Sequence, residues 1–96
     1  MAVYASAALA WELTTKYRNG RLQDAADIAL NLPAYVRQWH FEPLPITVEH
    51  SHRAGLLPGA HRDPFDRMLA AQANMEGLEL ATVDPALAGL GAKVVW

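Results

Sequence analysis

The chain alternates between segments with a helical spacing of apolar residues and short apolar runs that suit strands. Leu9, Leu13 and Tyr17 recur every four residues and mark one apolar face of a helix. Among the short runs, Val3-Tyr4-Ala5 is apolar and partly β-branched, which suits a buried strand. The predicted strands cover residues 3–5, 41–46, 78–82 and 93–96. The predicted helices cover residues 7–18, 24–30, 33–39, 48 to about 55, and 64–76, and one further helical turn begins at residue 84.

Side chains suited to helix ends support these boundaries. Ser6, Thr47 and Asp63 each precede a predicted helix and can accept a hydrogen bond from its free N–H groups. Pro64 occupies the first helical position after Asp63, where a missing N–H does no harm. The predicted helix stops are Gly20 and Gly77.

The order of the elements predicts the fold class. Strands alternate with helices, which indicates an α/β domain with a mainly parallel sheet. Pro43 and Pro45 lie in the second predicted strand, and proline cannot donate to a ladder, so this strand is predicted at an edge. No internal repeat or linker composition divides the chain, so residues 1–96 are expected to form a single domain.

Composition and charge exclude several classes of protein. The chain has no cysteine, which excludes disulfides and thiolate metal sites. No apolar run approaches the roughly 18 residues that span a bilayer, and the N-terminus does not resemble a signal peptide. We therefore expect a cytoplasmic protein with no membrane partner. The formal net charge of −2 gives no overall attraction to nucleic acid, so RNA would need local cations, for which the candidates are Lys16, Arg62 and Arg67.

Three carboxylates fall where a parallel α/β fold gathers its ligands, at the carboxyl ends of the strands. Glu12 lies in the helix after the first strand, Asp66 lies in the first turn of a later helix, and Asp84 follows the third strand. The positions three, four and seven beyond Asp66 are apolar, so this carboxylate does not belong to a solvated stripe. A carboxylate on a core-facing side needs a partner, which a metal ion or a basic group would provide.

Helix capping is the competing interpretation of these acids. Asp63 is expected to be an N-cap, and Asp66 and Asp84 could serve only to stabilise the positive ends of helices. If the carboxylates converge instead, their hard oxygen atoms suit Mg²⁺ or Mn²⁺. Periodicity and spacing leave both interpretations open.

At these residues the chain resembles PIN-domain proteins of the VapC toxin type. The resemblance extends in order along nearly the whole chain, and HRDPFDR at its third segment is the distinctive motif. The segments that carry it are SAALAWEL at residues 6–13, LPITVEH at 44–50, HRDPFDRMLAAQA at 61–73 and GLELATVD at 77–84.

The resemblance implies a fold, an activity and partners. Such proteins have a three-layer fold with a mainly parallel sheet flanked by helices. They are ribonucleases that use Mg²⁺ or Mn²⁺ to cleave RNA phosphodiester bonds, and they are usually toxins neutralised by an antitoxin and often homodimers. The implied catalytic and metal-binding residues are Glu12, Asp66 and Asp84, with Asp63 as a cap that could also lie just outside the ligand shell.

One departure from the family pattern bears on activity. Family members begin with a strand that ends in an aspartate, followed by a helix, and this chain is expected to lack both. A missing central strand predicts unpaired backbone inside the sheet. The alternative to an active nuclease is therefore a non-catalytic PIN remnant that binds an antitoxin or a dimer partner through the open sheet. A third interpretation is an unrelated α/β domain whose acids are only helix caps.

Overall fold

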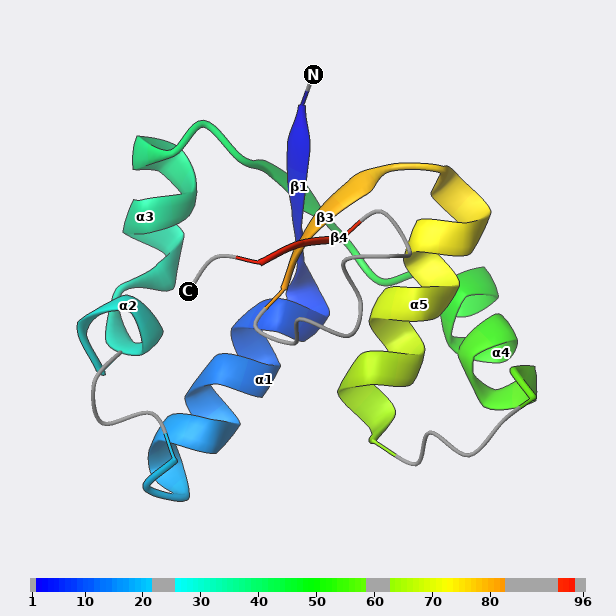
Figure 1. Cartoon of the computed structure of the whole chain (residues 1–96), viewed down its shortest axis with the longest axis horizontal. Coiled ribbons are helices and arrows are strands. Elements are labelled where there is room, and N and C mark those ends of the chain that lie inside the picture. Colours follow the sequence, from blue (N-terminus) through cyan, green and yellow to red (C-terminus); the bar gives the residue numbers. More distant parts are fainter. Residues whose placement is uncertain (1, 22–25, 59–62, 83–91, 95–96) are drawn as a thin grey trace.

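The computed structural model describes residues 2–21, 26–58, 63–82 and 92–94 (Figure 1). The strands are β1 (Val3–Ser6), β2 (Glu42–Leu44), β3 (Glu79–Thr82) and β4 (Ala92–Val94). The helices are α1 (Ala7–Arg18), α2 (Ala26–Leu30), α3 (Leu32–Gln38), α4 (Val48–Leu56) and α5 (Pro64–Glu76). This order confirms the predicted α/β class.

The described strands form one parallel sheet in the order β2-β1-β3-β4. The position of β2 at the end of this order confirms the edge location predicted from its prolines. β1 pairs with β2 over residues 4–6 and with β3 over residues 3–4. The prediction of unpaired backbone inside the sheet is therefore wrong for β1, because β1 has a hydrogen-bonded neighbour on each side.

Helices cover both faces of the sheet, which gives three layers. α2 and α3 lie on one side of the strands, and α4 and α5 lie on the other (Figure 1). Successive residues of β1 point to opposite faces, so Val3 and Ala5 join one core cluster and Tyr4 packs against the other. The buried residues of the first cluster are Val3, Ala5, Leu9, Leu13, Ala29, Leu32 and Ala81. Those of the second are Ala8, Leu69, Ala73 and Leu80.

The predicted helix caps are confirmed in atomic detail. The Ser6 side chain accepts a hydrogen bond from the Ala8 N–H at the start of α1. Thr47 and His50 form a reciprocal capping box at the start of α4. α5 begins after Asp63 and ends at Gly77, whose φ of 63° is in the left-handed region where glycine is favoured.

Some element boundaries differ from the predicted ones. β2 has three residues, fewer than predicted, and Pro43 within it cannot donate to a ladder. β3 begins at Glu79, one residue later than predicted. Residues 24–25, the turn predicted from residue 84, and residues 95–96 lie outside the described part of the chain. Within that part, no helix is long and apolar enough to cross a membrane.

Candidate metal centre

α1 places a carboxylate in the interior of the domain. Ser6 fixes the start of α1, and Leu9 and Leu13 bury its apolar face, so Glu12 on the adjoining face lies inside as well. The Glu12 side chain is 0% exposed. Its Oε2 atom accepts a hydrogen bond from the Lys16 ammonium at 2.9 Å, across one helical turn. Its Oε1 atom is buried and has no hydrogen-bond partner in the described structure.

The first turn of α5 brings two further carboxylates to the same place. α5 leads back into β3, and both the start of α5 and the start of α1 lie toward the carboxyl ends of the strands (Figure 1). Asp63 Oδ1 accepts hydrogen bonds from the N–H groups of Phe65 at 2.8 Å and of Asp66 at 3.4 Å. Asp66 follows one turn later and is 9% exposed. The N-terminal end of α5 therefore carries one half-buried and one buried carboxylate.

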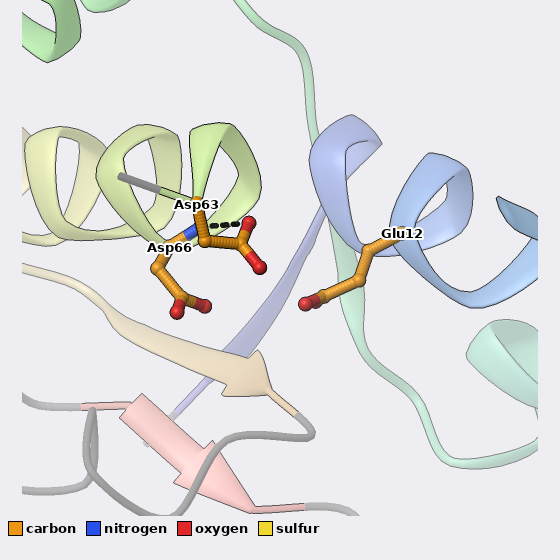
Figure 2. Close-up of side chains that lie close together, drawn as sticks. All are labelled: Glu12, Asp63 and Asp66. Atoms are coloured by element: carbon orange, nitrogen blue, oxygen red, sulfur yellow. Dashed lines mark hydrogen bonds between the residues drawn. The ribbon is translucent and has the colours of Figure 1, made fainter. Parts of the chain in front are cut away.

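Glu12, Asp63 and Asp66 converge across the contact between α1 and α5. One carboxylate oxygen from each residue lies within 4.8 Å of those of the other two. Figure 2 shows Glu12 reaching from α1 toward the two aspartates at the start of α5. Like charges at this separation repel one another strongly where water is excluded, so the group favours a cation.

The donor set fits a divalent cation. Carboxylate oxygens are the ligands that Mg²⁺ and Mn²⁺ prefer, and both ions also keep several waters. The buried, unpartnered Oε1 atom of Glu12 supplies a lone pair that no protein group uses in the described structure. A buried polar atom without a partner is costly in free energy, and a metal ion would remove that cost.

The structure brings together part of the predicted site. Glu12 and Asp66 are neighbours as predicted, while Asp84 and Arg62 lie outside the described residues. Asp63 is the confirmed N-cap, and its carboxylate also belongs to the acidic cluster rather than standing apart from it. Its spacing of three residues from Asp66, one helical turn, is the sequence signal that could have placed both acids together.

The basic candidates have specific protein partners. Lys16 lies beside the cluster through its contact with Glu12, and its side chain is 25% exposed. Arg67 donates hydrogen bonds to the carbonyl oxygens of Ala54, Gly55 and Leu57 at 3.0, 3.3 and 2.6 Å. These carbonyls belong to the C-terminal end of α4, so Arg67 holds that end of α4 against α5.

The comparisons with known proteins agree with this architecture. A parallel α/β domain in which a carboxylate from the middle of α1 meets two carboxylates at the start of α5 has the arrangement of a divalent-metal site. The family model of the PIN domain matches residues 2–93, and the chain therefore belongs to the PIN domain family. The PIN domain is generally a nuclease fold, and its members typically bind a divalent metal. Neither the search of curated proteins nor the search of solved structures found a match.

Proposed function

We propose that this chain is an endoribonuclease of the VapC toxin type that requires a divalent metal ion. The observation that carries the proposal is the convergence of Glu12, Asp63 and Asp66 within 4.8 Å, with a buried and unpartnered oxygen on Glu12. Helix capping explains Asp63 but does not explain a buried glutamate in the middle of α1. The interpretation of the acids as caps alone is therefore disfavoured.

Each acid has a role in the proposed site. Glu12 and Asp66 would hold Mg²⁺ or Mn²⁺ directly, and Asp84 is proposed as a third ligand from the resemblance. Asp63 fixes the start of α5 and adds negative charge beside the other two acids. When bound, the ion would act as a Lewis acid that activates water and stabilises charge on an RNA phosphate. Glu12 and Asp66 would orient that ion, because their helices are held by caps and by core packing.

The proposed partners follow from the same resemblance. RNA is the substrate that membership of the PIN family suggests. An antitoxin protein, a homodimer and a cytoplasmic location belong to the VapC hypothesis, together with a single domain over residues 1–96. The non-catalytic alternative rests on an open sheet; because β1 is paired on both sides, an added strand would have to join an edge of the sheet rather than β1.

The test compares the Asp66→Asn variant with a matched Asp27→Asn control. Asp27 is exposed on α2. Asp27→Asn therefore makes the same chemical change at a position outside the acidic cluster. With Mn²⁺ and a mixed RNA substrate, Asp66→Asn is expected to lower cleavage by about a hundredfold or more, because a metal ligand is lost. Asp27→Asn should cleave like the original chain.

Circular dichroism and calorimetric titration with Mn²⁺ complete the test. Asp66→Asn should remain folded and lose Mn²⁺ binding, while the control keeps both properties. Full RNA cleavage by the folded Asp66→Asn protein would contradict the proposal. If the original chain bound Mn²⁺ but cleaved no RNA, the non-catalytic alternative would take its place.

A further inference from the structure

An exposed tryptophan lies at the border of the acidic cluster. Trp11 directly precedes Glu12 in α1, and its side chain is 64% exposed. Phe65 directly precedes Asp66 in α5, and the rings of Trp11 and Phe65 meet edge to face with centroids 4.8 Å apart and an interplanar angle of 84°. The aromatic contact therefore bridges the same two helices that bring the acids together.

The contact orients the indole without burying it. An edge-to-face pair restricts the position of both rings, and Phe65 is only half-buried itself. Tryptophan usually covers most of its large surface inside a protein. Trp11 instead keeps nearly two thirds of its surface exposed. Its position is fixed on one side, and it leaves apolar aromatic surface available to a ligand.

Electrostatics explains why an uncharged aromatic surface would help to bind RNA at this site. The acidic cluster repels a phosphate backbone unless a cation neutralises it, and the net charge of the chain is −2. Arg67, a candidate phosphate contact, already donates hydrogen bonds to three carbonyls of the α4 end. Base stacking on an aromatic ring binds single-stranded RNA without any need for positive charge.

We propose that Trp11 stacks on an unpaired base of the RNA beside the phosphate to be cleaved. This inference rests on the proposed function and assigns Trp11 a role in binding the substrate. A base in a duplex has both faces covered by its neighbours, so the platform favours single-stranded RNA over double-stranded RNA. A protein partner on Trp11 is the competing explanation for its exposure.

The experiment measures RNA binding separately from cleavage. Fluorescence anisotropy of a labelled single-stranded RNA, and of the same sequence in a duplex, is recorded in Ca²⁺ for the full chain, Trp11→Ala and Trp11→Tyr. Trp11→Ala is expected to weaken single-strand binding by about tenfold, because one stacked base is lost. Trp11→Tyr keeps an aromatic face and should stay within about threefold of the original chain. Duplex binding should change little in either variant.

Val48→Ala is the matched control for loss of exposed apolar surface. Val48 is 81% exposed on α4, outside the acidic cluster, and its substitution should leave single-strand binding unchanged. In cleavage assays with Mn²⁺, Trp11→Ala should raise KM with little change in kcat, since it removes binding rather than chemistry.

Two results would overturn the inference. Equal single-strand binding by the original chain and Trp11→Ala would show that no base stacks there. A change in oligomeric state on analytical ultracentrifugation, without a change in RNA binding, would assign Trp11 to a protein interface. Failure of the nuclease proposal is distinguishable, because binding in Ca²⁺ requires no cleavage and Asp66→Asn tests cleavage independently.

Discussion

Glu12 is the residue whose surroundings bear most directly on the proposed metal binding. A fully buried carboxylate is unfavourable unless its oxygens are satisfied, and the described structure satisfies only Oε2, through Lys16. Lys16 is partly exposed and sits one helical turn away, so it can neutralise Glu12 while leaving Oε1 free for a cation. The Lys16 ammonium at Oε2 and a divalent ion at Oε1 would nonetheless repel each other, so the two cations would compete for one carboxylate.

Replacing Lys16 with methionine tests this competition. Without the ammonium, the free energy of unfolding of the metal-free chain should fall by roughly 1–2 kcal/mol, because the Glu12 charge stays buried. Mn²⁺ binding should tighten by about three- to tenfold, because the ion no longer shares the carboxylate with another cation. Urea denaturation and calorimetric titration measure the two effects, and Lys16→Arg, which keeps the charge, is the control. Weaker Mn²⁺ binding in Lys16→Met would mean that Lys16 supports the ion instead.

At the scale of the element, the first turn of α5 combines a structural task with a proposed chemical one. Asp63 stops the chain from fraying by accepting two backbone N–H bonds, and it also faces Glu12 and Asp66. Both tasks favour a carboxylate at a helix start, since the positive end of the helix stabilises negative charge there. The sequence presents the capping interpretation and the metal interpretation as alternatives, but for Asp63 the confirmed cap does not exclude the proposed metal site, because the same carboxylate lies in the acidic cluster.

The two tasks of Asp63 can be separated by substitution. Asp63→Ala should lower the free energy of unfolding by about 1 kcal/mol, because the cap is lost, and should also weaken Mn²⁺ binding. Asp63→Ser keeps a capping oxygen, so it should retain most of the stability while binding Mn²⁺ as weakly as the alanine variant. Thermal denaturation without metal and titration with Mn²⁺ provide the two readouts. A serine variant that binds Mn²⁺ like the original chain would reduce Asp63 to a cap.

Helix boundaries are the part of the fold that the sequence predicts best. The bounds of α5 agree with their prediction because Asp63, Pro64 and Gly77 act on the neighbouring backbone, and local effects are visible in local sequence. The edge position of β2 was predictable for the same reason, since Pro43 cannot donate to a ladder. The direct pairing of β1 with β3 was not predictable, because it joins segments more than seventy residues apart.

The sequence predicts the types of residue in the site better than it predicts which residues belong to the site. The apolar surroundings of Asp66 indicated a buried carboxylate, and its burial is confirmed. The three-residue spacing could have placed Asp63 beside Asp66, but the approach of both to Glu12 depends on the packing of α1 against α5, which periodicity does not contain. The contact between Trp11 and Phe65 depends on the same packing, so no spacing in the sequence predicts it.

At the scale of the whole molecule, a buried polar network connects the sheet and the start of α1 to the layer formed by α4 and α5. Ser6, which caps α1, donates its hydroxyl hydrogen to the side-chain carbonyl of Gln72 in α5. Gln72 in turn donates to the Pro45 carbonyl oxygen and contacts Nδ1 of His50, both at 3.2 Å. His50 Nδ1 also accepts from the Thr47 N–H, which leaves Nε2 to donate to Glu76 at 2.8 Å. One glutamine thus connects the start of α1, the end of β2 and the cap of α4 to α5.

This network predicts that Gln72 influences Mn²⁺ binding at the proposed metal site without contacting the ion. Gln72→Leu leaves the Ser6 hydroxyl and the Pro45 carbonyl without that partner, so the free energy of unfolding should fall by roughly 2–4 kcal/mol. Because the Ser6–Gln72 bond aligns α1 with α5, Mn²⁺ binding should also weaken, by less than in Asp66→Asn, where a ligand is lost. Gln38→Leu, on the exposed end of α3, is the matched control and should change stability by less than about 0.5 kcal/mol. If Gln72→Leu lost stability but bound Mn²⁺ as tightly as the original chain, the acids would be positioned by the packing of α1 and α5 alone.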